Sequence, residues 1–346
     1  MMKRAIQTKG CVHASDGLRC ALCGLLVFFM LPFTQSRQRS TTGTKDTRST
    51  QRSEASYFVQ ASLLTLSLLL FFALTASAQK TDKKLQRQVE ALLQGFHGSV
   101  GVYVKNLKNG KTVAINADTV FPTASMVKIP ILIGIEDKLA QSELSYHQIL
   151  TYKDSLLYAG VDILGSFKND EKIDLSKVLM LMLTTSDNTA SLWLQSLAGG
   201  GLRINQLLDS MGFVSTRVNS RTPSREAIRS VYGWGQTSPR EMATLMEKIA
   251  AGTIINSERS AQMLRLLGRN YWDEQAVSQI PSDVFVASKN GAVDASRSEV
   301  LFVAGHDARY IFCICTKNNK DQSWEPTNEA WVLTRNLSKL LWNYFN

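Results

Sequence analysis

Residues 121–139 read FPTASMVKIPILIGIEDKL and place a Ser-x-x-Lys pattern at the start of an apolar run. The run predicts a helix from about Ala124 to about Leu139, with Ser125 in its first turn. Residues three apart share one face of a helix, so we expect Lys128 to reach the Ser125 hydroxyl. A lysine that burial and neighbouring cations keep neutral can accept the proton of a serine nucleophile. The start of the helix also offers free N–H groups to a developing oxyanion.

A second motif, Ser186-Asp187-Asn188, follows the apolar helix pattern of residues 175–183. A second motif is needed, because a Ser-x-x-Lys pattern arises by accident about once in a chain of this length and is weak evidence alone. A hydroxyl here can relay a proton, and an amide can hold a substrate carbonyl. The alternative is an ordinary helix N-cap before Thr189, since Ser, Asp and Asn all favour that position.

A third motif, Lys289-Asn290-Gly291, ends the apolar strand pattern of residues 284–289 and would act as a substrate anchor. Its glycine permits close approach of the backbone to a ligand. A plain turn at the end of a strand is the alternative interpretation.

Strand patterns stand near both ends of the chain from residue 79 onward, and helix patterns fill the middle. A helix is expected over 81–96 and a hairpin over 99–117, with Asn109-Gly110 as its turn. Further expected elements are helices over 175–183, 189–197, 204–211, 239–251 and 327–344, and strands over 284–289, 299–304 and 310–317. This order predicts an α/β (α+β) fold, in which an antiparallel sheet is flanked by N- and C-terminal helices and an all-helical domain is inserted. The expected sheet domain spans 79–133 plus 281–346, and the helical domain spans 134–280.

The three motifs start 61 and 103 residues apart. Their order and separation favour the catalytic interpretation of each motif over the alternative that holds for it alone. Over residues 79–346 the chain resembles the class A β-lactamase and penicillin-binding-protein group of active-site serine hydrolases. Phe121-Pro122-Thr123-Ala124 before the serine and Thr237-Ser238-Pro239 further on also match this group. The resemblance implies a β-lactamase-like fold and acyl transfer through a serine.

The resemblance also implies a role for each matching residue. Ser125 would be the acylated nucleophile, Lys128 its base and Ser186 the proton relay. Asn188 would anchor the substrate, and the N–H groups of Ser125 and Ala292 would form the oxyanion hole. The other substrate-binding residues that it implies are Lys289, Asn290, Gly291, Ala292 and Arg297, with Lys289 and Arg297 assigned to a substrate carboxylate.

Two positions depart from the family pattern. The middle of the third motif is usually Thr or Ser, and here it is Asn290. Class A enzymes also carry a Glu, followed four residues later by an Asn, that hold the deacylating water. Those positions correspond to Thr222 and Glu226 in this chain. Either the deacylating carboxylate is missing, or Glu226 supplies it from the neighbouring position; an exposed surface residue is the third interpretation.

The first 78 residues are expected to lie outside the fold. Residues 56–78 form an apolar segment that ends in Ala76-Ser77-Ala78, the small-x-small pattern of signal-peptide cleavage. Cleavage after Ala78 would export the protein to the periplasm or the medium, and a retained membrane anchor is the alternative. Residues 1–55 are interpreted as a disordered or mis-annotated N-terminal extension.

The overall charge does not indicate a nucleic-acid partner. Residues 1–78 carry +6 of the formal net charge of +10, and the rest of the chain has no basic run. Cys313 and Cys315 fall two apart in an apolar strand pattern and are expected to be small buried side chains. No Cys or His spacing suggests zinc, so no metal or other cofactor is expected. A monomer is expected, with membrane contact only through the N-terminal segment.

Three functions follow from these observations. The first is an exported serine β-lactamase that opens β-lactam rings through an acyl-Ser125 intermediate, with deacylation in doubt and antibiotic resistance as its consequence. The second is a penicillin-binding-protein-like peptidase or esterase that acts on peptidoglycan peptides. The third is a non-catalytic cell-wall binding module.

Overall fold

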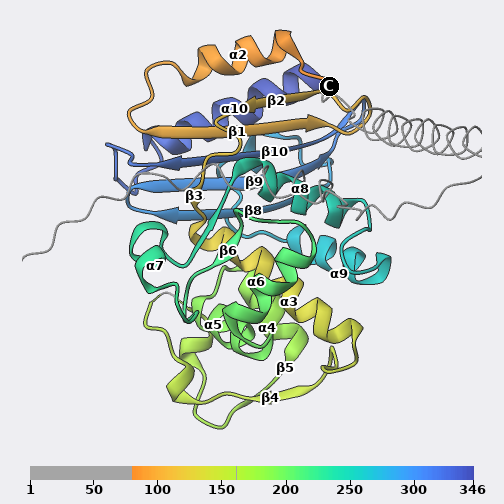
Figure 1. Cartoon of the computed structure of the whole chain (residues 1–346), viewed down its shortest axis with the longest axis vertical. Coiled ribbons are helices and arrows are strands. Elements are labelled where there is room, and N and C mark those ends of the chain that lie inside the picture. Colours follow the sequence, from red (N-terminus) through yellow and green to blue (C-terminus); the bar gives the residue numbers. More distant parts are fainter. Residues whose placement is uncertain (1–79, 161) are drawn as a thin grey trace, which may run out of the picture. The chain divides into compact units, whose positions relative to one another are not determined.

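The computed structural model describes residues 80–160 and 162–346. Its centre is a five-stranded antiparallel sheet in the order β2-β1-β10-β9-β8 (Figure 1). Both ends of the described chain contribute to this sheet, and β8 forms one edge. The strands are β1 Ser99–Asn106, β2 Thr112–Ile115, β8 Val286–Val293, β9 Ser296–Ala304 and β10 Arg309–Lys317.

One face of the sheet packs against the two terminal helices, α2 Lys83–Leu93 and α10 Glu329–Phe345 (Figure 1). Alternate residues of the strands, such as Val104, Leu301 and Val303, point into this layer and are buried there. The sheet therefore separates two hydrophobic cores of the described chain, one on each of its faces. The predicted sheet with its N- and C-terminal helices is confirmed.

The opposite face packs against α8 Pro239–Ala250, and the remaining helices gather beyond the β8 edge (Figure 1). Except for the exposed helix over residues 226–232, their buried apolar faces join that side of the sheet in one core. The helices are α3 Lys128–Ala140, α4 Leu175–Thr184, α5 Asn188–Leu197, α6 Gly200–Ser210, α7 Glu226–Tyr232 and α9 Ser257–Leu267. Short strands complete the helical part: β3 Phe121–Pro122, β4 Ile149–Thr151, β5 Lys172–Asp174, β6 Arg217–Val218 and β7 Gly235–Thr237.

Three details of the sequence prediction were wrong. The segment that begins at Ala124 is first a 3-10 turn, η1 Ala124–Val127, and the α-helix begins only at Lys128. The third motif lies within β8, because this strand continues its pairing with β9 up to the turn after Val293. Helices α7 and α9 were not predicted, since α7 is short and exposed and α9 is mostly polar.

The described residues form one compact unit, and the expected boundaries at 133 and 280 inside it stay a prediction. Cys313 and Cys315 are buried, as expected. Within residues 80–160 and 162–346, no helix has the length and apolar character needed to cross a bilayer. The predicted N-terminal extension and signal peptide lie outside the described residues.

Candidate active site

Ser125 lies in the η1 turn, three residues before Lys128. In a 3-10 turn, side chains at i and i+3 eclipse each other, so this geometry aligns the two more closely than an α-helix would. The turn starts with Ala124 in the left-handed region, at a φ of 43°. That strained residue bends the chain from β3 into the turn. Pro130 is tolerated in the first turn of α3, because the N–H that proline lacks would have no partner within the helix there.

The Lys128 ammonium is the centre of the polar contacts around the serine. Lys128 Nζ lies 3.1 Å from Ser125 Oγ, 3.0 Å from Ser186 Oγ and 2.8 Å from Asn188 Oδ1. It also contacts the carbonyl oxygen of Ser186. The structure thus brings together four of the side chains that the sequence singled out.

Burial lowers the pKa of Lys128 well below its usual value. The side chain is 0% exposed, and desolvation disfavours its charged form. The nearby Lys289 ammonium lowers the pKa further, whereas Asp162 and Asp187 act in the opposite direction. A neutral Lys128 amine can accept the Ser125 proton, which is what a general base at this position must do.

The second motif serves both as a helix cap and as part of the site. Asp187 is the N-cap of α5, and its side chain accepts a hydrogen bond from Ala190 N, as the alternative interpretation held. Ser186, with a φ of 63°, turns its hydroxyl toward Lys128 instead. Asp162 accepts hydrogen bonds from the backbone N–H groups of Asn188 and Thr189. Two carboxylates therefore fix the loop that presents Ser186 and Asn188.

Lys289 is fully buried beside the Lys128 network. Its ammonium donates to the Asn290 carbonyl oxygen at 2.9 Å and to Asn290 Oδ1 at 3.3 Å. Burial lowers the pKa of Lys289 to about 7, and the Glu299 carboxylate partly offsets that change. Burial likewise raises the pKa of Glu299 to about 7. These two buried groups therefore change charge near neutral pH, next to the base.

Gly291 permits a close approach, but the approach is to the nucleophile's own turn. A Cβ at this position would lie 2.3 Å from Thr123 O and 2.7 Å from Ser125 N. Ser298 Oγ donates to the same Thr123 oxygen at 3.0 Å. Only glycine lets the β8 edge lie this close to η1, and this contact places Ala292 on the cavity beside Ser125.

The structure does not bring Arg297 to the cavity. Because Ser298 faces η1, its neighbour Arg297 points to the opposite face of the sheet, toward α10. Its guanidinium lies 4.5 Å from the ring centre of Trp324 and 4.8 Å from that of Trp331. It also donates to backbone carbonyl oxygens, including those of Asp294 and Ser323. These contacts hold the guanidinium away from the cavity lining, and the expected contact with a substrate carboxylate stays a prediction.

Neither residue of the expected deacylating pair faces the serine. Glu226 begins α7 with its side chain exposed, in accord with the surface interpretation. Thr222 is buried, and its hydroxyl donates to the Ser220 carbonyl oxygen at 2.9 Å. The loop that carries them contributes residues 231–234 to the cavity and no acidic side chain.

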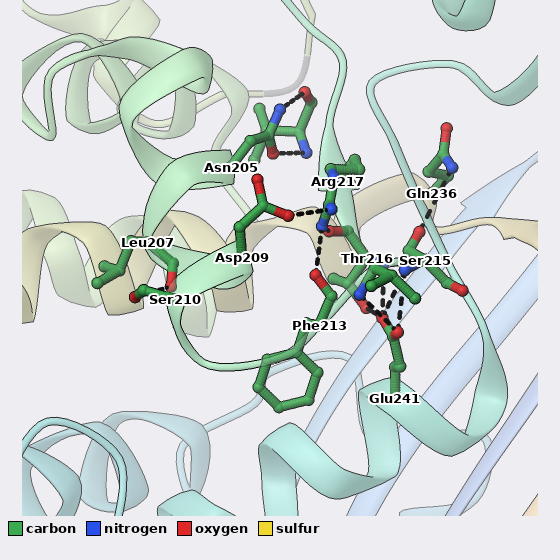
Figure 2. Close-up of polar contacts among 12 residues, drawn as sticks. Asn205, Leu207, Asp209, Ser210, Phe213, Ser215, Thr216, Arg217, Gln236 and Glu241 are labelled. Carbon is green, nitrogen blue, oxygen red and sulfur yellow. Dashed lines mark hydrogen bonds and ion pairs between the residues drawn. The ribbon is translucent and has the colours of Figure 1, made fainter. Parts of the chain in front are cut away.

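The base of this loop is fixed by one carboxylate of α8. Glu241 accepts hydrogen bonds from the backbone N–H groups of Val214, Ser215 and Thr216 at 2.7–3.0 Å (Figure 2). Arg217 continues the network by donating to the Phe213 carbonyl oxygen at 2.7 Å (Figure 2). The loop therefore leaves the helical core from a rigid anchor and reaches the cavity at its far end.

A cavity of about 500 Å³ opens beside Ser125. Ser125, Asn188 and Ala292, all predicted site residues, line it, whereas Lys289, Arg297 and Glu226 do not. Sequence reasoning missed several of its walls, because they come from loops and from the end of β10. The lining residues not predicted as site residues are Pro122, Ala124, Tyr158, Val231, Tyr232, Gly233, Trp234, Val293, Ala295, Ser296, Lys317 and Asn318.

The chain is similar in sequence and in fold to known proteins. Beta-lactamase VEB-1 of Pseudomonas aeruginosa is 24% identical over 301 residues, which cover 82% of this chain and 97% of VEB-1. The solved structure of PBP-A is 25% identical, with a TM-score of 0.69, over 77% of this chain and 97% of PBP-A. A mutant of PBP-A, solved as an acyl-enzyme complex with penicillin G, is 26% identical, with a TM-score of 0.68, over 77% of this chain and 98% of the mutant.

A model of the beta-lactamase enzyme family matches residues 84–345, which is most of the chain. The chain therefore belongs to the beta-lactamase enzyme family, within its class A and penicillin-binding-protein-like group.

Proposed function

We propose that this chain opens β-lactam rings by accepting their acyl group on Ser125. The observation that carries the proposal is the 3.1 Å contact between Ser125 Oγ and the buried Lys128 amine. As Oγ bonds to the carbonyl carbon, Lys128 takes the Oγ proton, and the N–H groups of Ser125 and Ala292 hold the oxyanion. The C–N bond then breaks, and the Ser186 hydroxyl passes the proton from Lys128 to the leaving nitrogen.

The proposal includes a long-lived acyl-enzyme. Its hydrolysis needs a base that activates water, and the nearby carboxylates are either engaged in hydrogen bonds or exposed away from the cavity. Asp162 and Asp187 cap α5, and Glu226 is exposed at the start of α7. No acidic residue lines the cavity within the described chain. We therefore expect acylation to be fast and turnover to be slow.

The lack of an acidic side chain among the described residues that line the cavity also favours a second candidate function. In this function, peptidoglycan stem peptides are the substrates, and the acyl group leaves the serine by transfer to an amine or by slow hydrolysis. β-Lactams then act as inhibitors. The likeness to PBP-A, one mutant of which forms an acyl-enzyme with penicillin G, supports this candidate. The non-catalytic alternative has no comparable support, because Lys128 Nζ lies within hydrogen-bonding distance of the hydroxyls of both Ser125 and Ser186.

Intact-mass spectrometry after incubation with benzylpenicillin tests the proposal. We expect the mass to rise by one penicillin, and the rise to vanish in Ser125→Ala. The adduct should persist after free penicillin is removed, with the same lifetime in Glu226→Gln. Absence of an adduct in the unsubstituted protein would sink the proposal, and rapid steady turnover would refute the long-lived intermediate.

Export remains part of the proposal. The apolar segment 56–78 and the Ala76-Ser77-Ala78 pattern support cleavage after Ala78 and a periplasmic or secreted product. N-terminal sequencing of the mature protein tests this. A product that begins at Gln79 is expected, and one that retains residues before Ser56 contradicts it.

A further inference from the structure

Lys317, at the end of β10, is the one charged residue among those of the described chain that line the cavity. Ser125 lines the same cavity, so an acyl group attached to the serine occupies space that extends to this lysine. The other fourteen lining residues are neutral, and nine of them are apolar or aromatic, including Val231, Tyr232 and Trp234. A cation in such surroundings is weakly screened, which strengthens its attraction for an anion.

The Lys317 ammonium is held in place without an acidic partner. Its Nζ donates to the Val120 carbonyl oxygen at 2.8 Å. The rings of Phe121 and Tyr232 flank it, with centres 4.9 and 6.0 Å from Nζ. Among the ion pairs of the described residues, none involves Lys317.

This arrangement leaves capacity for a ligand. An ammonium has three N–H donors, and the Val120 carbonyl accepts from one of them. The backbone contact and the two rings restrict the long side chain, so little additional ordering is needed when an anion binds. Neighbouring Ser296 cannot substitute as the donor, because its hydroxyl already donates to the Thr316 carbonyl oxygen at 2.6 Å.

We propose that Lys317 forms an anion subsite, which selects substrates whose acyl portion ends in a carboxylate remote from the scissile carbonyl. This inference rests on the proposed acylation of Ser125. The acyl side is favoured because Asn188 and Ala292 line the cavity with Lys317. Lys289, expected to bind the carboxylate of the other side, is buried outside the cavity lining.

The test uses two cephalosporins that differ only at the end of the acyl chain. The 7-glutaryl derivative of aminocephalosporanic acid ends in a carboxylate, and the 7-pentanoyl derivative ends in a methyl group. The measured quantity is the ratio of their second-order rate constants for acylation, followed by intact mass. Because both rate constants are measured on the same variant, their ratio does not depend on the fraction of that variant that is folded.

In the unsubstituted protein the glutaryl compound should react faster. Lys317→Met should lower the glutaryl-to-pentanoyl ratio about tenfold, the usual size of a lost charge-assisted hydrogen bond. Lys320→Met is the matched control, since it removes the same charge from an exposed position three residues away and should keep the ratio. Lys317→Gln should behave as Lys317→Met does.

A ratio that stays unchanged in Lys317→Met and Lys317→Gln, while Ser125 is still acylated, overturns the subsite and leaves the proposed function intact. A ratio that falls equally in Lys320→Met also overturns it, because the effect is then one of general charge. Lack of adducts with benzylpenicillin and with both cephalosporins in the unsubstituted protein is a different result, and it refutes the proposed function.

Discussion

Lys128 Nζ lies 3.1 Å from Ser125 Oγ, although the lysine side chain is completely buried. Two features of the surroundings allow this. Desolvation and the neighbouring Lys289 lower the pKa of Lys128, and oxygen atoms of Ser186 and Asn188 bond its hydrogens. The same contacts that stabilise the buried group also aim it at the serine. The burial of Lys128 and its polar contacts therefore make it able to act as a base at this site.

Lys128→Arg should abolish most of the acylation, because a guanidinium keeps its proton at any pH of interest. Loss of a general base costs about 10²- to 10⁴-fold in rate. The measurement is the rate of adduct formation with benzylpenicillin. Lys138→Arg, in the last turn of the same helix, is the control and should react at the normal rate. Equal rates for the two variants would mean that another group deprotonates Ser125.

Glu299→Gln should change how stability depends on pH. Burial raises the pKa of Glu299 to about 7, so the folded chain keeps a proton that the unfolded chain releases near pH 4.5. The stabilising effect of this group is complete below about pH 4.5 and is lost as the pH rises through about 7. The unfolding free energy of the variant minus that of the natural protein should therefore rise by about 1–2 kcal/mol from pH 5 to pH 7.

Urea denaturation at both pH values measures that difference. Parallel pH curves for the two proteins would show that Glu299 keeps an ordinary pKa. The acylation rate gives a second readout, because Glu299 acts on Lys289, and Lys289 lowers the pKa of Lys128. Without the carboxylate, Lys289 loses its charge at lower pH, and the pKa of Lys128 rises. The acid limb of the rate profile should then move to higher pH.

Arg297→Met should lower stability and leave substrate binding unchanged. The substitution removes the contacts with Trp324 and Trp331 and the hydrogen bonds to backbone carbonyl oxygens such as those of Asp294 and Ser323. We expect a loss of about 2–4 kcal/mol in the free energy of unfolding. Denaturation and the concentration dependence of acylation separate the two effects. Normal stability with weaker binding would restore Arg297 as a carboxylate ligand.

The motifs predicted the contact between Ser125 and Lys128 because their spacing is local. A separation of three residues in one turn decides the Ser125 and Lys128 contact. The face on which Arg297 lies depends instead on the register of β9 against β8, and a shift by one residue reverses it. Lys317 was not found because Phe121 and Tyr232, which surround it, are distant in the sequence.

Glu241→Gln should loosen the loop that closes the cavity. Its carboxylate bonds the N–H groups of Val214, Ser215 and Thr216, and an amide offers only one acceptor oxygen for them (Figure 2). We expect a loss of about 1–3 kcal/mol in unfolding free energy. Glu226→Gln is the control, since that residue is exposed and should be neutral. Hydrogen exchange of these amides localises the effect, and unchanged protection would refute it.

Gly291→Ala should separate the β8 edge from the nucleophile turn. The added methyl group would lie 2.3 Å from Thr123 O and 2.7 Å from Ser125 N, so the backbone on one side must move. That movement displaces an expected oxyanion donor, and loss of one such donor costs about 10²- to 10³-fold in rate.

Gly160→Ala is the matched control, because a Cβ at Gly160 meets nothing within 4 Å. Denaturation of both variants shows whether Gly291→Ala remains folded at the temperature of the assay. A folded Gly291→Ala protein that acylates at the rate of the control would mean that the oxyanion is held elsewhere. A rate loss in the folded variant, with benzylpenicillin still labelling Ser125, places the defect at the contact between β8 and η1.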